Sequence, residues 1–166
     1  LLLSRRASDF SEKNADATYS AAQLSVLLGK QKEAIELLKK PIQIEPSHVG
    51  ACNDLAWQLA MTGQDLNLAL ELAERASRLQ PDGNTLDTLG WVQMKRGNIN
   101  GAAKSLRVAH ELEPDSPDIQ YHLAVVLAKQ DDTEQAAKLL RQALSGDDPF
   151  SDRQAAETEL ARLEKR

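Results

Sequence analysis

The chain has 166 residues, of which 42% are apolar and 27% are charged, and its formal net charge is −5. A single cysteine excludes an internal disulfide and any metal site built from several cysteines. The acidic balance argues against nucleic acid as the main partner, because phosphates bind to basic surfaces. Leu and Ala together number 49, whereas Val and Ile number only 11. This composition predicts an all-α protein.

Residues 1–14 form the first segment of the chain. They include three leucines and two arginines, but they are too short for a membrane span and lack the apolar stretch of a signal peptide. We interpret this segment as the remnant of an upstream repeat or a linker.

An internal period begins after this segment. Gly29, Gly63 and Gly97 are 34 residues apart, and Asp131 occupies the next slot. A fixed period of this length is typical of repeat proteins built from helical pairs. The period divides the chain into four units and a final capping helix, at residues 15–48, 49–82, 83–116, 117–150 and 151–166.

Each unit contains the pattern of two helices. Apolar and small residues recur at helical spacing on both sides of the glycine, and a proline follows the second helix in most units. We expect Asp65 and Asn98 to cap second helices, and Ser151 to cap the last helix. The expected helices lie near 15–28, 32–45, 49–62, 66–80, 84–96, 99–113, 117–130, 133–145 and 152–165.

Pro41 conflicts with this pattern. It lies inside the second helix of the first unit, where a proline removes a backbone hydrogen bond and crowds the preceding turn. We therefore expect a kink or an early break between Leu38 and Pro41.

These small residues and prolines resemble the tetratricopeptide repeat (TPR). The resemblance depends on a small residue at the eighth position of each unit, with Ala near the twentieth and Pro near the thirty-second position. The second unit has one extra residue in its inner turn, so its Ala and Pro come one place later, and the Pro of the fourth unit is also one place late. It implies a right-handed solenoid of four helix-turn-helix repeats with a C-terminal capping helix. The family's usual Trp at the fourth position is replaced by Thr18, Cys52, Leu86 and Gln120.

The stretches around Trp57, Trp91 and Tyr121 carry a narrower resemblance. They are similar to the C-terminal repeats of exosortase-associated (PEP-CTERM system) TPR lipoproteins of the bacterial envelope. Similar strings occur in many bacterial TPR proteins. The compartment therefore stays open between cytoplasm and periplasm.

The TPR resemblance also implies a binding surface. In this family the first helices line a concave groove, and the fifth and ninth positions of each unit face into it. In this chain those positions are Tyr19, Gln23, Asn53, Trp57, Asp87, Trp91, Tyr121 and Val125. Four of the six aromatic residues fall in this set, which is the kind of surface that buries a peptide segment. The alternative is that the two Trp rings pack between helices.

The charges beside these positions bear on the partner. Asp16, Asp54, Asp87 and Asp118 occupy places where a groove for C-terminal carboxylates would carry Lys or Arg. Acidic groups repel a carboxylate, so we expect an apolar or aromatic partner with some positive charge. We expect no nucleic acid, no cofactor, no metal and no direct insertion into a membrane.

Catalytic candidates are few. His48, His110 and His122 are far apart in sequence, and Cys52 has no evident base nearby. Packed or surface histidines and a packed cysteine are the simpler interpretation, although His122 lies beside the expected groove.

The sequence therefore predicts a non-catalytic scaffold that binds a partner segment in its groove. A second hypothesis is a structural or oligomerisation module of a larger bacterial envelope protein for exopolysaccharide or protein sorting, which self-associates through an uncapped N-terminal end. A third hypothesis is an enzyme.

Overall fold

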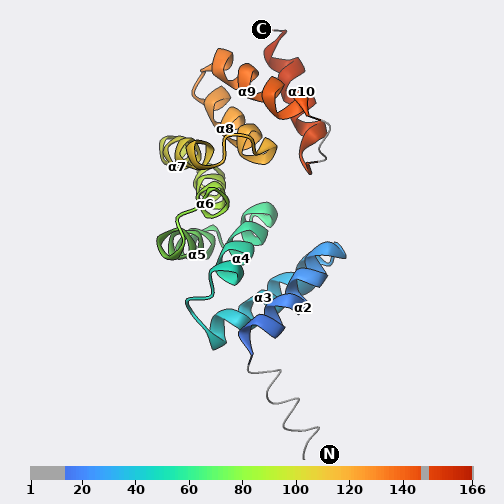
Figure 1. Cartoon of the computed structure of the whole chain (residues 1–166), viewed down its shortest axis with the longest axis vertical. Coiled ribbons are helices and arrows are strands. Elements are labelled where there is room, and N and C mark those ends of the chain that lie inside the picture. Colours follow the sequence, from blue (N-terminus) through green and yellow to red (C-terminus); the bar gives the residue numbers. More distant parts are fainter. Residues whose placement is uncertain (1–13, 147–149, 166) are drawn as a thin grey trace, which may run out of the picture. The chain divides into compact units, whose positions relative to one another are not determined.

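The computed structural model describes residues 14–146 and 150–165, and all regular structure within them is helical (Figure 1). The helices form two compact units. Unit 1 ends at Gln80 and unit 2 begins at Pro81. The predicted segment 1–14 lies outside the described residues except for Asn14, which caps the first described helix.

Unit 1 consists of two helix-turn-helix pairs. In each pair the first helix packs against the second, and α3 also packs against α4 to join the pairs. The helices are α2 (Ala15–Leu27), α3 (Gln31–Ile44), α4 (Val49–Thr62) and α5 (Leu66–Leu79).

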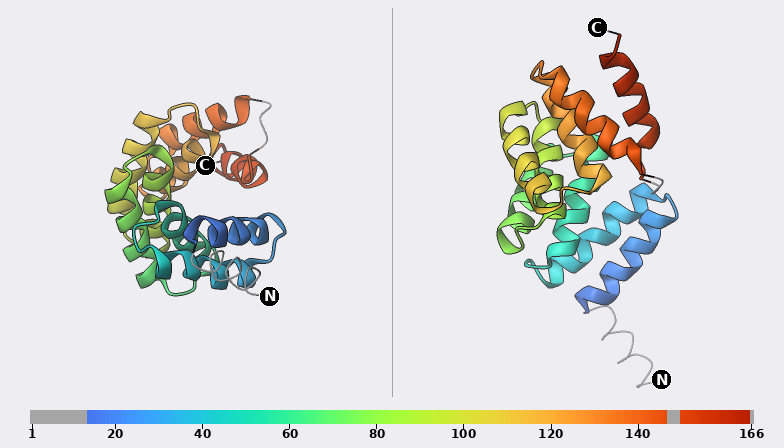
Figure 2. Two further views of the ribbon diagram at one scale, coloured as in Figure 1. Left: turned by 60° about the horizontal axis from the view of Figure 1, so that its bottom comes forward. Right: turned by 45° about the horizontal axis from the view of Figure 1, so that its top comes forward.

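Unit 2 contains two further pairs and the last helix. Helix α6 packs on α7, α7 on α8, α8 on α9, and α10 covers α9 (Figure 2). The helices are α6 (Gly83–Lys95), α7 (Ile99–Leu112), α8 (Pro117–Lys129), α9 (Thr133–Ser145) and α10 (Arg153–Leu163). The predicted all-α arrangement of helix-turn-helix pairs and a last helix is confirmed.

The period of glycines marks the ends of the first helices. Gly29, Gly63 and Gly97 have φ of +68°, +67° and +82°, in the left-handed region that glycine adopts without a steric penalty. Asp131 occupies the same place in the fourth pair with φ of +62°. Asp is one of the few other residues that tolerate this conformation, so the turn survives without glycine.

Small residues allow the helices to approach closely. The alanine near the twentieth position of each repeat is fully buried in both units, and Leu fills most of the remaining core positions. These alanines are Ala34, Ala69, Ala102 and Ala136. Gly90 shows why the eighth position must be small, since an added Cβ would lie 2.5 Å from Cγ of the buried Leu106. The residues with no exposed area include Ala22, Ala34, Leu38, Ala56, Ala69, Ala73, Ala102, Leu106, Ala124, Ala136 and Leu140.

Most of the predicted helix starts are confirmed. Asp65 and Asn98 accept backbone N–H groups of their helices at 3.1 and 3.0 Å. The prediction for Ser151 was wrong by one residue, because Asp152 is the N-cap of α10 and its side chain makes no capping hydrogen bond. That carboxylate instead faces His122.

The predicted break near Pro41 was also wrong. Helix α3 continues through Pro41 to Ile44, and the proline ring is buried. Pro41 lies in the last turn, so only one helical hydrogen bond is lost, and its own carbonyl still accepts the N–H of Glu45 at 2.8 Å. Burial of the ring among the neighbouring side chains offsets this loss.

Candidate functional site

The eight predicted groove residues differ in exposure. Gln23 is exposed, and Tyr19, Trp57 and Val125 are half-buried. The other four are buried, with exposed fractions of 5% for Asn53, 7% for Asp87, 7% for Trp91 and 9% for Tyr121. Unit 2 brings Asp87, Trp91, Tyr121 and Val125 into one neighbourhood.

A cleft in unit 2 contains two of these residues. It lies between α8 and α10 and has a volume of about 810 Å³. Helix α8 contributes Tyr121, Val125, Ala128 and Lys129, which are the fifth, ninth, twelfth and thirteenth residues of the fourth repeat. Their spacing of three and four residues places them on one face of the helix.

Helix α10 forms the opposite wall of this cleft. Its contributing residues are also spaced by three and four, so one helix face meets another across the cleft. These residues are Gln154, Ala155, Thr158, Glu159 and Arg162, and Asp131 adds a carboxylate from the turn before α9. The floor is apolar and aromatic, whereas the rim carries both signs of charge.

The rim residues Glu159 and Arg162 are bound to one another. The guanidinium donates Nε–H to Oε2 at 2.8 Å and Nη2–H to Oε1 at 2.6 Å, a bidentate pairing across one turn of α10. Burial of the Tyr121 hydroxyl, followed by the negative charges of Asp152 and Glu159, raises the pKa of this phenol. The carboxylates of Asp152 and Glu159 therefore both act on the Tyr121 hydroxyl.

A buried ion pair lies behind Tyr121. His122 is 2% exposed, and its Nδ1 lies 2.8 and 2.9 Å from the two carboxylate oxygens of Asp87 on α6. Its Nε2 lies 3.7 Å from Oδ2 of Asp152, which precedes α10. Burial alone would lower the pKa of His122, but the charges and hydrogen bonds of the two carboxylates outweigh it and raise the pKa from 6.5 to about 9. His122 is therefore a cation at neutral pH, and it links α6, α8 and the start of α10.

Aromatic rings enclose this pair. The Trp91 ring lies 4.3 Å from the His122 ring and 6.4 Å from that of Tyr121, and Lys95 Nζ lies 5.2 Å from the Trp91 ring. Phe150 is buried with its ring 6.5 Å from Tyr121. Trp91 thus packs between helices, while Tyr121 contributes both to this packing and to the cleft.

Unit 1 contains a related cluster. Tyr19 on α2 donates its hydroxyl hydrogen to Oδ2 of Asp54 on α4 at 2.7 Å. The Tyr19 ring packs against His48 with centroids 4.7 Å apart, and His48 Nδ1 accepts the N–H of Ala51 as the N-cap of α4. Gly50 leaves room for the phenol, because a Cβ there would lie 2.8 Å from the Tyr19 oxygen.

The cysteine among the catalytic candidates is enclosed by the packing of unit 1. Cys52 is fully buried, its Sγ lies 3.7 Å from the Pro46 carbonyl oxygen, and burial raises the pKa of the thiol. Within residues 14–146 and 150–165, no three His, Cys, Asp or Glu side chains are grouped so that they could hold a metal ion. The described helices also include none with the length and apolarity to span a membrane.

The role of α10 as one wall of the cleft was not predicted from the sequence. The sequence predicts only a capping helix there, whereas Ala155 of this helix is exposed and lines the cleft. The 34-residue period, carried one step further, gives the signal. It leads from Tyr121, Val125 and Ala128 to Ala155, Glu159 and Arg162.

Comparison with known proteins agrees with the fold. A family model described as "Tetratricopeptide repeat" matches residues 93–163, which is less than half of the chain. The chain is similar to the thermophilic TPR protein TTC0263 of Thermus thermophilus, with a TM-score of 0.74 and 23% identity over 98% of this chain and 87% of that one. It is similar to YrrB, described as a TPR protein with an unusual peptide-binding site, with a TM-score of 0.69 and 17% identity over 97% of this chain and 81% of that one. The chain therefore has the fold of a tetratricopeptide repeat protein.

The curated relatives are longer proteins. TPR repeat-containing protein PA4667 of Pseudomonas aeruginosa is 31% identical over 103 residues, which are 60% of this chain and 17% of that protein. A probable biofilm formation methyltransferase, WspC of Pseudomonas putida, is 31% identical over 73% of this chain and 29% of its own length. The chain thus spans less than a third of these relatives, and the match does not carry their activities over.

Proposed function

We propose that this chain is a non-catalytic protein-interaction module that holds a peptide segment of a partner in the cleft between α8 and α10. One observation carries this proposal. The groove residues Tyr121 and Val125, together with Ala128 and Lys129 of the same helix, line an open cleft of about 810 Å³, opposite one face of α10. A cleft of this size suits a few side chains of an extended segment, and its apolar floor with polar groups on the rim is typical of binding sites.

The chemistry of the walls favours an apolar or aromatic side chain with a nearby positive charge. Such a side chain would cover Val125 and the Tyr121 ring, where a buried aromatic contact contributes most of the binding free energy. The carboxylates of Asp152 and Glu159 act on the same end of the cleft, so a cation on the ligand is attracted there. The peptide-binding site named for YrrB supports this role at the level of the fold alone.

A matched pair of valines tests the proposal. Val125 lines the cleft, whereas Val108 is 44% exposed on α7 and lies outside it. The probe is a fluorescein-labelled nonapeptide that consists of leucine and phenylalanine residues and two lysines. Its counterpart carries glutamates in place of the two lysines. We expect Val125→Arg to weaken binding of the lysine peptide by at least about tenfold, because a charged side chain fills the apolar floor.

Val108→Arg adds the same charge and bulk, and we expect it to change the affinity by less than about twofold. Circular dichroism verifies that both variants are folded. Equal affinities of the two variants, or preference for the glutamate peptide, would overturn the proposal.

A second role in self-association is favoured by a different surface. Near the end of α2, Leu24 and Leu27 are 57% and 83% exposed, and the following Leu28 is 60% exposed. Contiguous exposed leucines are typical of an interface. Light scattering over a dilution series would support this role if the mass rises with concentration and Leu27→Lys abolishes the rise. A constant monomer mass removes it.

The link to the bacterial envelope is a narrower hypothesis. It depends on the resemblance of the segments around Trp57, Trp91 and Tyr121 to exosortase-associated lipoproteins. Under it, the cleft would bind a segment of another envelope protein, and the chain would work in the periplasm. Localisation of the full-length protein by cell fractionation tests this hypothesis directly.

A further inference from the structure

A second cleft of unit 2 lies on the other side of α8. It has a volume of about 310 Å³ and is bounded by α7 and α9. Its floor is formed by Leu123 and Leu127 of α8 and Leu139 of α9, which are 3%, 4% and 7% exposed. Leu123 follows Tyr121 by two positions, and Leu127 follows Val125 by two positions. Tyr121 and Val125 line the first cleft. Two positions correspond to a rotation of about 200° around a helix, so the two clefts occupy opposite faces of α8.

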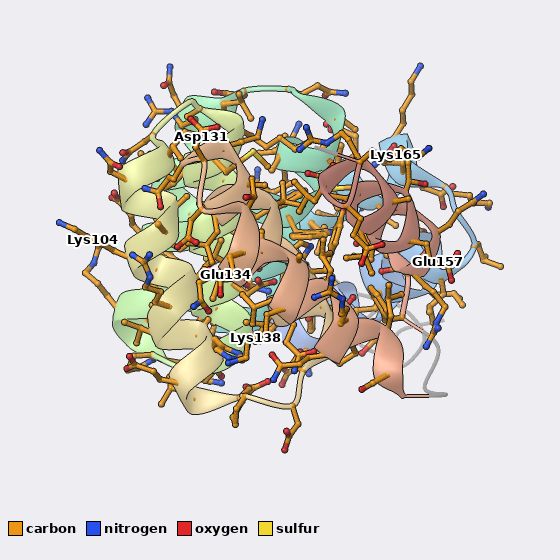
Figure 3. All side chains as sticks on the ribbon, turned by 90° about the horizontal axis from the view of Figure 1, so that it is seen from above. Lys104, Asp131, Glu134, Lys138, Glu157 and Lys165 are labelled. Carbon is orange, nitrogen blue, oxygen red and sulfur yellow. The ribbon has the colours of Figure 1, made fainter. Side chains whose placement is uncertain are left out.

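Positive charge flanks this second cleft from both helices. Arg107 of α7 and Lys138 of α9 line it, and both side chains are exposed. In the described part of the chain, neither cation has an ion pair or a side-chain hydrogen bond. Figure 3 shows Lys138 on α9 near Glu134, one turn earlier, and these two side chains do not form an ion pair.

The other titratable groups of the cleft are His110 and Asp132. Asp132 is already used as the N-cap of α9, where its Oδ1 accepts the N–H of Gln135 at 3.4 Å. His110 lines the cleft, and its Nδ1 is buried without a hydrogen-bond partner among the described residues. A buried ring nitrogen without a partner costs free energy, which a polar ligand group can offset.

We propose that this cleft docks an acidic segment of a partner protein, with a Glu or Asp side chain between Arg107 and Lys138 and a neighbouring apolar side chain on the leucine floor. Charge complementarity carries the choice of occupant. The chain as a whole has a net charge of −5, yet two cations from different helices face this cleft without carboxylate partners in the described part. Guanidinium and ammonium groups in this arrangement attract a carboxylate and fix its position.

This site differs from the proposed α8–α10 cleft in both face and charge preference. The first cleft is proposed to take an apolar or aromatic side chain with a nearby positive charge, whereas the second favours an anionic ligand. One module could then contact a partner on two faces of the same helix pair. Neither proposal depends on the other.

The test uses two short peptides and residue-resolved detection. The probes are an acetylated hexapeptide of alternating leucine and glutamate, and its counterpart with glutamine in place of glutamate. Titration into the isotope-labelled chain is followed by amide chemical shifts. We expect the glutamate peptide to shift amides of α7, α9 and the α8 leucines, with an affinity at least about tenfold above that of the glutamine peptide. Binding should weaken as salt is added.

Charge-reversal variants on α7 sharpen the test. Arg107→Glu is expected to weaken binding of the glutamate peptide by at least about tenfold. Lys104→Glu makes the same change of charge on the same helix outside the cleft, where the side chain extends away from the other helices (Figure 3), and it should change binding by less than about twofold. Equal shifts with the two peptides would overturn the proposal. So would equal effects of the two variants, shifts at the first cleft alone, or the same response to free acetate.

Discussion

The two units of the molecule contain the same contact made from different side chains. In unit 1, Tyr19 at the fifth position of the first repeat binds Asp54 at the sixth position of the second repeat, with 2.7 Å between oxygens. In unit 2, Asp87 at the fifth position of the third repeat binds His122 at the sixth position of the fourth, at 2.8 Å. Both pairs are 35 residues apart. The repeat therefore fixes which positions meet, and the residue types decide what kind of interaction forms.

The pairs differ in burial and charge. Tyr19 and Asp54 are half-buried, and a neutral hydroxyl faces the carboxylate. Asp87 and His122 are 7% and 2% exposed, and His122 is a cation at neutral pH because its pKa is raised to about 9. Water can replace the partner in the first pair more easily than in the second. We therefore expect the two pairs to respond very differently to mutation and to pH.

The largest difference is expected when one carboxylate is removed from each pair. Asp87→Ala leaves a buried imidazole without its main counter-ion and should lower the free energy of unfolding of unit 2 by about 3–5 kcal/mol. The variant Asp87→Asn keeps the shape of the Asp87 side chain and removes only its charge, so it separates the effect of charge from that of packing. The measurement is urea unfolding, followed for unit 2 by Trp91 fluorescence in a Trp57→Phe background and for unit 1 by Trp57 fluorescence in a Trp91→Phe background, since each unit contains one Trp.

Asp54→Ala is the matched control in unit 1, and we expect it to cost about 1 kcal/mol, the usual net value of a partly exposed hydrogen bond. The expected difference between the two pairs would be contradicted if Asp87→Ala lowered the free energy of unfolding by no more than Asp54→Ala. In that case, Asp152 alone would suffice as the counter-ion of His122.

The second prediction concerns pH. The pKa of His122 is raised in the folded state from 6.5 to about 9, so its stabilising contribution is full below pH 6.5 and is lost as pH rises to about 9. The expected loss for unit 2 is on the order of 3 kcal/mol. Burial and the neighbouring Asp54 raise the pKa of Tyr19 above its ordinary value of 10, so the contribution of this phenol is lost only above pH 10.

Amide hydrogen exchange, corrected for its intrinsic dependence on pH, can follow both units in one sample. Between about pH 6 and about pH 9, protection in α6 and α8 should fall, while protection in α2 and α4 stays nearly constant. The variant His122→Gln should remove the pH dependence in unit 2. A fall of equal size in both units would assign the effect to general charge repulsion instead of His122.

Much of the fold follows from the repeat period because each repeat satisfies local rules. The left-handed turns at Gly29, Gly63 and Gly97 and the buried alanines are requirements of single helix pairs, so the sequence displays them directly. Pro41 was predicted wrongly because its effect depends on its place within a turn and on the packing of its ring. The sequence pattern contains neither.

The site was harder to predict for a related reason. The groove positions of α8 follow from the period, but the surroundings of Tyr121 and His122 do not, because Phe150 packs against the Tyr121 ring and Asp152, before α10, lies beside His122. Those groups come from a region where the period weakens. Burial is a property of several elements together, so a single repeat position does not determine it.

The smallest expected effect tests whether burial is the true cause of the difference. Tyr19→Phe keeps the ring against His48 and removes only the hydroxyl that donates to Asp54. We expect a loss of about 1 kcal/mol in unit 1, because water can solvate much of the Asp54 carboxylate that remains. Hydrogen exchange of the α2 and α4 amides, recorded during urea unfolding, measures this loss of stability.

Gly50→Ala supplies a second perturbation of the same contact, since the added Cβ would lie 2.8 Å from the Tyr19 oxygen and must displace the phenol. Its helix propensity gain of about 1 kcal/mol should then be cancelled by loss of the contact. If Tyr19→Phe instead cost as much as Asp87→Ala, the strength of the contact would be set by the repeat register alone. Burial and charge would then have no separate part in it, and a pair at the same two positions of any repeat should be equally strong.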